Sequence, residues 1–552
     1  MKKNKKLIYV IVFSFIFVFF FFLTIFLLAN RHWFYPYETA IKYEYSDSLD
    51  DKIDDLKDSC EKLLIDQNDY DKFITEYNEL EDCYSELNTY YKIEYLNYCN
   101  KHMAANIRLM NIYSEKKTDL YNWLGSLYSK IYNSKYKNQF YEGFDENDIN
   151  YIIKSHSEEA TKKEEEISVI QDKYTNLSDT EQKNQFNYYF KELINKNNEY
   201  AKIVGYENYY DYANEREFSR DYTKDDMLVY ADYINKYFIG NYKMHDGLVY
   251  DSISYYKKYS MSLIDDLSKY KYTEWEKLGY NEINAINLYS ESLGSDYYNE
   301  YMNFKNDGIL IESNEKDCYD GAFTTYLSYL NKPAMYLGNT TYQNVYTYLH
   351  EFGHYYNFTK SKANNVSLDL CETHSQANEL LFLSYLLNNK ILTFSWIRDQ
   401  IATRLQFFIQ MAVNTTVIGL VEYEAYNKGT VTEDMIANII DETVEKYMPN
   451  VFDIFVKDTM KNYIKSVIID HPMYYFSYST SICSSLNLFS LSLKSYTDTK
   501  DKYLYIQDYE NYDGYIKTLE NAGLTNPFEE DLYIDLNDLY KNIEEVVIDI
   551  YS

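Results

Sequence analysis

The chain has 552 residues and a strong acidic excess, with 86 Asp and Glu against 54 Lys and Arg and a formal charge of -32. Such a charge favours solubility and repels nucleic acid, so we expect no nucleic-acid partner. Only 15 glycines and 5 prolines are present, which argues against an all-β or loop-rich fold. The composition therefore predicts a large, mainly α-helical protein.

The first 29 residues predict a membrane anchor. Residues 1–6 carry four lysines, and residues 7–29 form an uncharged run dominated by Phe, Ile, Leu and Val. This run exceeds the roughly 20 residues that cross a bilayer as one helix. A cleavable signal peptide is the alternative, but its apolar region is normally about 7 to 15 residues long, and no small-residue cleavage site follows here. We therefore expect an uncleaved anchor.

The charges around the anchor predict its orientation. Lysines precede it, whereas acidic residues follow it: Glu38, Glu44, Asp47, Asp50 and Asp51. Under the positive-inside rule, residues 1–6 form a cytoplasmic tail and the remainder of the chain lies outside the cell. The expected location is the cell membrane, with a single transmembrane helix.

Residues 30–200 have the pattern of an N-terminal helical region. Apolar residues recur at helical spacing in several stretches, among them Leu56, Leu63 and Leu64, then Ile107, Leu109 and Ile112, then Leu120, Leu124 and Leu127. This spacing is typical of long amphipathic helices. No repeat or flexible linker separates this region from residues 201–552, so we expect one two-lobed helical body.

Two short aromatic runs interrupt the helical pattern. Residues 322–330 and 333–337 are rich in β-prone side chains and flank the turn-like pair Asn331-Lys332. The sequence therefore predicts a small β segment at this point of the chain.

The sequence His350-Glu351-Phe352-Gly353-His354 lies within residues 342–358, which we predict to be one helix. Residues four apart share one face of a helix, so His350 and His354 can offer two imidazole nitrogens to a single zinc ion. Glu351 lies beside that point and can take a proton from the attacking water. With only eight histidines in the chain, chance spacing of two surface histidines is a weak alternative.

A third metal ligand is expected on a second helix over residues 368–387. Glu372 is the leading candidate, and Glu379 shares its face at i+7, where it can orient a metal-bound histidine. A solvated surface carboxylate is the alternative for Glu379. Asp369, at the edge of the face, and His374, on a different side, are weaker candidates for the third ligand.

These segments resemble the thimet oligopeptidase and oligoendopeptidase F family of zinc metallopeptidases. The resemblance rests on the run His350 to His354 followed by Cys371 to Glu379. It extends to Gly205 to Tyr209, Asp320 to Phe323 with Leu337 to Asn339, and His471 to Tyr478. It implies a mainly α, two-lobed, zincin-type fold in which a small β segment borders a deep cleft. It also implies a single zinc ion, Glu372 as third ligand and oligopeptide substrates.

The tyrosine-rich run His471 to Tyr478 provides candidates for oxyanion stabilisation, which a phenol donor can supply. Tyr475 and Tyr478 are three residues apart and would share a helical face. His471 lies two turns back on a similar side, and Tyr474 replaces Tyr475 if the helix is rotated. By position Tyr478 resembles a catalytic tyrosine of the family. Simple packing is the alternative for each tyrosine in a chain with 69 of them.

We therefore expect residues 201–552 to be the catalytic region of a membrane-anchored zinc metallo-endopeptidase, with Glu351 as general base. A carboxypeptidase or dipeptidyl carboxypeptidase on the same residues is one alternative. A non-catalytic, membrane-anchored peptide-binding protein is the other. The edge of the β segment is expected, from the resemblance, to bind substrate backbone, and a purely structural hairpin is the alternative.

Overall fold

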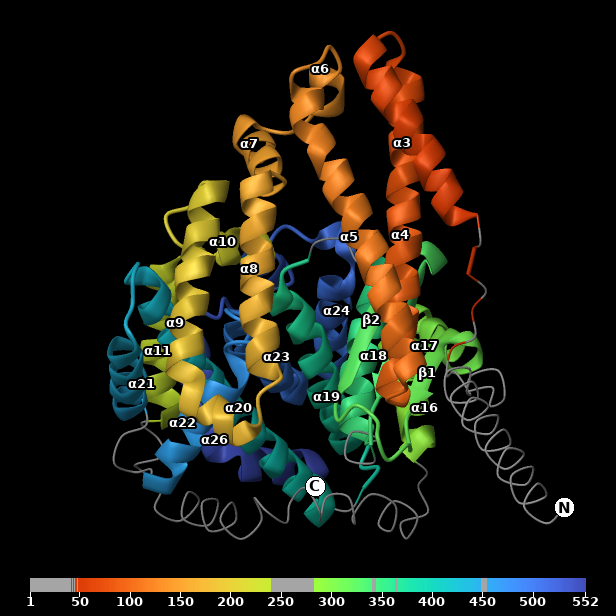
Figure 1. The fold of residues 1–552 in the computed structure, drawn as a ribbon. Coiled ribbons are helices and arrows are strands. Elements are labelled where there is room, and N and C mark those ends of the chain that lie inside the picture. The colour runs from red at the N-terminus through yellow and green to blue at the C-terminus, as the bar shows by residue number, and fades with distance from the viewer. Residues whose placement is uncertain are drawn as a thin grey trace, which may run out of the picture.

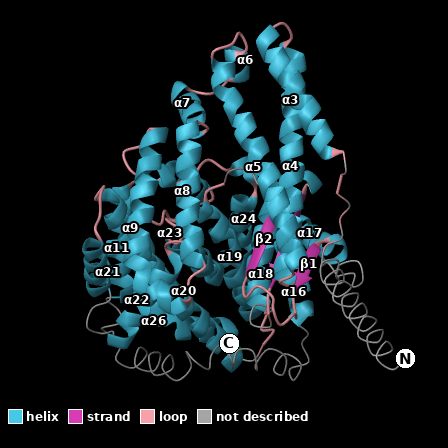
Figure 2. Ribbon diagram, in the orientation of Figure 1, coloured by secondary structure: helices cyan, strands magenta, loops and turns pink. Residues whose placement is uncertain are grey.

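The computed structural model describes residues 41–552 except 42, 44, 47, 240–281, 340–343, 363–365, 393 and 448–453. The predicted cytoplasmic tail, residues 1–6, and the predicted anchor, residues 7–29, lie outside the described residues. The described part is mainly helical with one small sheet, as the sequence predicts (Figures 1 and 2).

The described helices follow one another along the chain with few strands between them (Figure 1). Up to the sheet they are α3 (Leu49–Asp66), α4 (Tyr70–Asn100), α5 (Ala104–Tyr132), α6 (Lys137–Phe140), α7 (Glu146–Ser155), α8 (Glu158–Thr175), α9 (Asp179–Val204), α10 (Tyr209–Tyr212), α11 (Lys224–Tyr233), α16 (Glu282–Leu293) and α17 (Ser295–Asp307). After the sheet they are α18 (Val345–Ser361), α19 (Leu368–Asn388), α20 (Phe394–Asn427), α21 (Glu433–Tyr447), α22 (Ile454–Val467), α23 (Phe476–Lys494), α24 (Tyr496–Gln507), α25 (Tyr515–Asn521) and α26 (Glu530–Tyr551).

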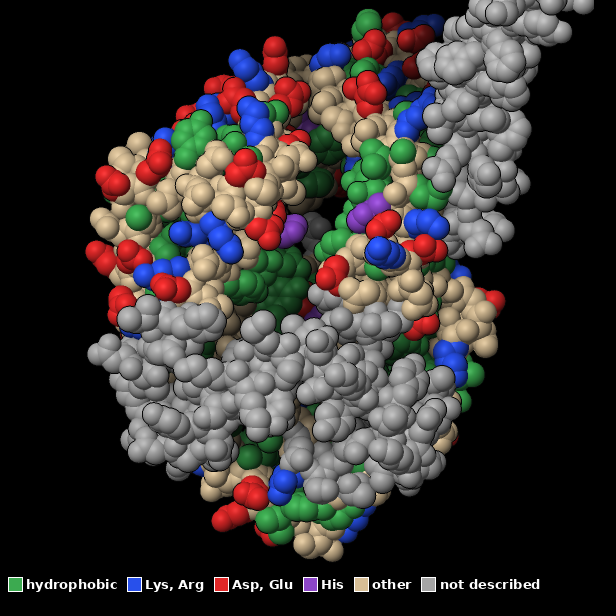
Figure 3. Space-filling model, turned by 60° about the horizontal axis from the view of Figure 1, so that its bottom comes forward, with side chains coloured by type: hydrophobic (Ala, Val, Ile, Leu, Met, Phe, Trp, Pro, Cys, Tyr) green, Lys and Arg blue, Asp and Glu red, His purple; other side chains and the backbone are tan. Residues whose placement is uncertain are grey.

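The elements gather into two masses. Figure 1 shows α3, α4 and α5 beside the sheet, α17 and α18 on one side, and α8, α9, α11 and α21 on the other. Helices α19 and α23 lie between them and pack extensively on each other. The space-filling view in Figure 3 is deeply hollowed between the two masses.

The sheet contains β1 (Ile309–Glu312), β2 (Ala322–Leu327) and β3 (Lys332–Leu337), in the order β1-β3-β2. Strands β2 and β3 form the antiparallel hairpin that the sequence predicts, and β1 joins β3 in parallel. Asn331 takes a left-handed conformation (φ 48°) in the turn between β2 and β3. Strand β2 is therefore an edge strand of the described sheet.

The register of the hairpin decides which backbone groups of β2 stay free. Gly338 N–H donates to the Gly321 carbonyl at 2.8 Å, so Gly321 and Gly338 form a hydrogen-bonded pair. Hydrogen-bonded and non-hydrogen-bonded pairs alternate along an antiparallel ladder. The backbone groups of Ala322, Thr324 and Tyr326 therefore point away from β3, towards the free edge.

Helices α18 and α19 pack closely because Gly353 has no side chain. A Cβ atom at residue 353 would lie 2.7 Å from the Ser375 Cα and 2.9 Å from the His374 carbonyl oxygen. Next to this contact, the Asn378 amide donates to the Leu349 carbonyl at 2.7 Å. Both helices begin and end within a few residues of the limits that the sequence predicts. The close approach brings their polar faces together.

One described helix segment, Gln400–Asn427 of α20, is long and apolar enough to cross a membrane by length and composition. The structure buries 72% of its apolar window among other elements. Ile418 and Val421 are completely buried in the main hydrophobic core, which also includes residues of α9, α19 and α23. The segment therefore has the surroundings of a core helix.

Candidate metal centre and active site

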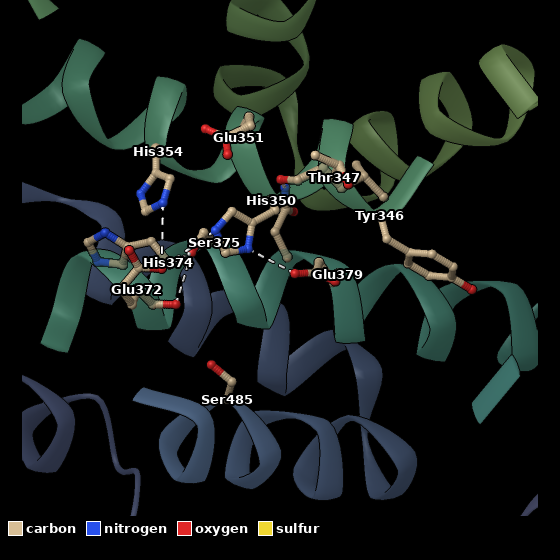
Figure 4. A network of polar contacts seen from close by, with 12 residues as sticks. Tyr346, Thr347, His350, Glu351, His354, Glu372, His374, Ser375, Glu379 and Ser485 are labelled. Atoms are coloured by element: carbon tan, nitrogen blue, oxygen red, sulfur yellow. Dashed lines mark hydrogen bonds and ion pairs between the residues drawn. The ribbon is translucent and has the colours of Figure 1, made fainter. Parts of the chain in front are cut away.

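Three donor atoms from α18 and α19 meet at one point. Figure 4 shows His350 and His354 projecting from one helix towards Glu372 on the other. The Glu372 Oε2 atom lies 3.5 Å from Nε2 of His350 and 3.7 Å from Nε2 of His354. The donor atoms of all three residues lie within 4.8 Å of one another. The structure thus brings together the three residues that the sequence predicts as metal ligands.

This arrangement fits a zinc ion. Ligand atoms about 2.0–2.1 Å from a tetrahedral ion stand roughly 3.4 Å apart, close to the separations of 3.5 and 3.7 Å from Glu372. Two imidazoles and one carboxylate with a remaining open position form the donor set of a catalytic zinc site. The geometry and the chemistry of the donors therefore agree.

Electrostatics favour the metal-binding forms of two ligands. Burial would raise the pKa of Glu372, but His354 and His350 outweigh it and lower that pKa to about 2. Burial lowers the pKa of His354 to about 4. Burial opposes protonation of His350 as well, but Glu372 and Glu379 raise its pKa well above the usual value. The carboxylates thus attract positive charge to the point where the three donors meet.

Glu379 lies where the sequence predicts it, beside His350. Its Oε1 atom is 2.9 Å from Nδ1 of His350, so the carboxylate can accept the ring N–H and fix the imidazole with Nε2 facing Glu372 (Figure 4). Its Oε2 atom is 2.8 Å from the Arg404 guanidinium. Arg404 in turn lies over the Tyr346 ring, 4.0 Å from its centroid. Arg404 was not predicted, because it is far from the motif in sequence.

Glu351 is held by strand β2. The Thr324 hydroxyl lies 2.8 Å from Glu351 Oε2 and can donate to it. The side chain is buried, and burial raises the pKa of Glu351 to about 7, against the lowering effects of His350 and the Thr324 hydrogen bond. A carboxyl group that titrates near neutral pH suits a general base. Thr324 is a second site residue that the sequence analysis missed.

Two tyrosine hydroxyls adjoin the metal ligands. The hydroxyls of Tyr474 and Tyr478 are 3.1 Å apart, and the Tyr478 hydroxyl interacts with the Glu372 carboxylate. Burial is the first cause of a raised pKa at Tyr474 and Tyr478, so both remain protonated donors near neutral pH. Tyr475 instead stacks on Tyr478 at 6.2 Å between ring centroids and contacts Tyr463.

The helical register that we expected for His471 to Tyr478 is corrected by the structure. Helix α23 begins only at Phe476, and Met473 has a left-handed backbone (φ 65°) in the preceding turn. Arg220 donates to the Met473 carbonyl at 2.7 Å, and Glu422 accepts from the Met473 N–H at 2.5 Å. These buried contacts hold a turn in place of the expected helix, and it is the hydroxyl of Tyr474, the alternative to Tyr475, that lies beside the Tyr478 hydroxyl.

The remaining candidates lie apart from the three donor atoms. His471 is exposed, and its ring contacts Tyr474 at 5.6 Å between centroids. His374 turns away, with Nε2 2.8 Å from the Ile506 carbonyl oxygen. Asp369 accepts from Tyr222 at 2.9 Å and pairs with the buried Arg220. The weaker ligand candidates His374 and Asp369 therefore have structural partners elsewhere.

Comparison with known proteins places the fold among peptidases. No family model and no curated protein matches the sequence. A solved structure assigned as oligoendopeptidase F from Bacillus anthracis shares the fold with a TM-score of 0.67 at 12% identity, over 93% of this chain and 99% of that one. PZ peptidase A gives a TM-score of 0.67 at 13% identity, over 92% of this chain and 99% of that one. An M32 carboxypeptidase from Deinococcus radiodurans gives a TM-score of 0.50 at 11% identity, over 86% of this chain and 99% of that one.

The fold and the converging ligands define the class: the chain has the architecture of the mainly helical peptidases. More narrowly, it has the fold of oligoendopeptidase F, which confirms at the level of the fold the resemblance given by the sequence motifs. At these identities the activity does not follow from the fold, and we argue it from the site.

Proposed function

We propose that the chain is a zinc metallo-endopeptidase that hydrolyses oligopeptides. The proposal is carried by one observation: the donor atoms of His350, His354 and Glu372 converge on one point, and the buried carboxylate of Glu351 is near enough to feel the charges of His350 and Glu372. A zinc ion held by the three ligands would polarise the scissile carbonyl and acidify the attacking water. The peptidase fold of the structural neighbours supports the same class of reaction.

In this mechanism Glu351 takes the proton of the attacking water and returns it to the leaving amine. The Thr324 hydroxyl, which is 2.8 Å from Oε2, orients the carboxylate for this transfer. Glu379 keeps the His350 ring in the orientation that presents Nε2. Each group thus has a defined position before substrate arrives, which favours the reaction.

The free edge of β2 supports binding of an extended peptide. The outward backbone groups of Ala322 and Thr324 can pair with substrate backbone by strand addition. Because the Thr324 hydroxyl also binds Glu351, a peptide paired at Thr324 would lie beside the general base. The hollow between the two masses would admit an extended chain more readily than a folded protein (Figure 3).

Tyr478 and Tyr474 are the proposed oxyanion donors. Their hydroxyls are 3.1 Å apart and face the Glu372 side of the site. A neutral phenol can donate to a developing negative charge without a change of its own charge. Tyr475 and His471, which the sequence also suggested, keep a supporting role through their ring contacts with Tyr478 and Tyr474.

The test compares the wild type with Glu351→Gln, using the full chain in detergent. Bound zinc is measured by elemental analysis, and hydrolysis is measured with an internally quenched peptide blocked at both ends. We expect both proteins to bind one zinc and only the wild type to cut, with a loss of about 100-fold or more in the variant. A wild type that binds zinc and cuts neither blocked nor free peptides would contradict the proposal.

An exopeptidase is the second candidate, because the M32 carboxypeptidase shares the fold. A carboxypeptidase or dipeptidyl carboxypeptidase would cut the same peptide only with a free carboxyl terminus. A membrane-anchored peptide-binding protein without activity would bind the peptide and leave it intact. The blocked and free forms of one peptide therefore separate the three functions.

We also propose that residues 7–29 anchor the protein in the cell membrane with the catalytic region outside. The proposal rests on the apolar run and the lysines before it. The protein should stay with membranes after alkaline extraction, and protease added to intact cells should degrade the catalytic region. Release by alkali, or protection in intact cells, would overturn it.

A further inference from the structure

Two lysines lie on one face of α4, and one of them reaches the free edge of β2. The Lys92 ammonium of α4 is 2.8 Å from the outward carbonyl oxygen of Tyr326. The Lys117 ammonium of α5 lies 3.3 Å from Asn88 Oδ1 and 4.5 Å from the centroid of the Tyr91 ring. Asn88 and Lys92 are four apart in α4 and share a face. The two cations therefore occupy the same face of this helix.

Neither ammonium has a carboxylate within 4.0 Å among the residues that the structure describes. The residue before Lys117, Lys116, does pair with a carboxylate, that of Asp50. Both lysines are partly buried, and burial lowers the pKa of each, with Lys117 adding to the effect at Lys92. A bound anion would offset the energetic cost of burying the two ammonium groups and would reduce the repulsion between them.

The position of Lys92 relative to the active site follows from the strand. Tyr326 is two residues beyond Thr324 on β2, which is about 6.7 Å along an extended strand. The Thr324 hydroxyl binds Glu351, and the Tyr326 carbonyl binds Lys92. The Lys92 ammonium therefore lies along the free edge of β2, about two residues of an extended peptide away from the proposed general base Glu351.

We propose that Lys92 and Lys117 form a subsite for a carboxylate of the peptide substrate. This rests on the proposed function, because it assumes that the peptide lies along β2. An Asp or Glu side chain and a free carboxyl terminus share this chemistry. The subsite selects acidic peptides within a protein whose overall charge repels them, so its effect opposes the general electrostatics of the chain.

The test measures peptide binding to the uncleaving Glu351→Gln variant of the full chain, loaded with zinc. The probes are a fluorescent neutral decapeptide blocked at both ends, the same peptide with Glu placed at each position in turn, and the neutral peptide with a free carboxyl terminus. We expect one of the carboxylate forms to bind about tenfold or more tightly than the neutral peptide, as a charge-assisted hydrogen bond provides. The form that gains affinity identifies the source of the carboxylate.

Lysine substitutions then test the assignment. Lys92→Met and Lys117→Met should each reduce the preference by several-fold, whereas Lys116→Met should leave it unchanged. Lys117→Met keeps the contact between Lys92 and Tyr326, so it also tests the subsite if Lys92→Met unfolds the protein. Equal binding of all peptides, or a preference that survives both substitutions, overturns the subsite.

The outcomes separate this inference from the proposed function. If the wild type cuts no peptide but Glu351→Gln still prefers a carboxylate through Lys92 and Lys117, the peptidase proposal fails and the subsite stands. If the wild type cuts neutral peptides and no preference exists, the subsite fails alone. If no peptide binds, both are wrong.

Discussion

Arg404 binds Glu379 at 2.8 Å, on the carboxylate oxygen that does not face His350. The guanidinium is held over the Tyr346 ring, so it has little freedom to follow a displaced partner. The arrangement links a cation on α20 to the candidate ligand His350 on α18 through one carboxylate of α19. In the proposed metal site, Arg404 is therefore a positioning residue that acts through Glu379.

Arg404→Met should weaken zinc binding by about 10- to 100-fold, because Glu379 would lose the contact that fixes it against the ligand His350. The dissociation constant is measured by competition with a chelator. Arg398→Met is the control, since Arg398 lies on the same helix with its side chain exposed and facing Glu544. Unchanged zinc affinity in Arg404→Met would show that Glu379 needs no such support.

Tyr478→Phe should lower kcat by about 100-fold with a small change in KM, because the lost hydroxyl acts on charge that develops during the reaction. Tyr474→Phe should have a smaller effect, since its hydroxyl is 3.1 Å from that of Tyr478 and orients it. Tyr475→Phe should stay close to the wild type. A large loss in Tyr475→Phe with an intact rate in Tyr474→Phe would restore the pairing of Tyr475 with Tyr478 that we first expected.

The sequence was sufficient to predict that the three candidate ligands come together, because this depends on local geometry. Residues 350 and 354 share a face in any α-helix, and the length of the second apolar run placed Glu372 on the next helix. The hairpin was also predictable, because its turn and strands are adjacent in the chain. Local rules explain these successes.

The parts that could not be predicted depend on contacts between distant segments. Thr324 and Arg404 reach the site from β2 and α20, and nothing in their own neighbourhood indicates a role. The turn at Met473 is held by Arg220 and Glu422, which are 253 and 51 residues away. Periodicity alone favours a helix there, and the tertiary contacts override it.

Gly353→Ala should destabilise the protein, although alanine is the better helix former by roughly 1 kcal/mol. The added Cβ would lie 2.7 and 2.9 Å from backbone atoms of α19, which cannot rotate away. Overpacking of this kind costs about 1–3 kcal/mol. The free energy of unfolding, measured in urea, and the zinc affinity should both fall. Thr359→Ala on the same helix is the control. A more stable Gly353→Ala would show that the two helices separate easily.

Glu422→Gln tests the buried support of the turn through its pH dependence. Burial raises the pKa of Glu422 to about 8 from an ordinary value of 4.5, against the lowering effects of Met473 and Arg220. One carboxyl oxygen accepts from Met473, and the other has no partner among the described groups, which suits the protonated form. The stabilising contribution of this proton is complete below about pH 4.5 and is lost as the pH rises through about 8.

Between about pH 6 and about pH 9 the wild type should therefore lose on the order of 2 kcal/mol more unfolding free energy than Glu422→Gln. Glutamine keeps the acceptor for the Met473 N–H and has no charge to bury, so its stability should change less over this range. Urea unfolding at both pH values gives the comparison. Glu424→Gln, which alters a half-exposed carboxylate on the same helix, should follow the wild type. If Glu422→Gln loses as much stability as the wild type, Glu422 is already ionised at the lower pH, and its charge is balanced by Arg220 rather than removed by a proton.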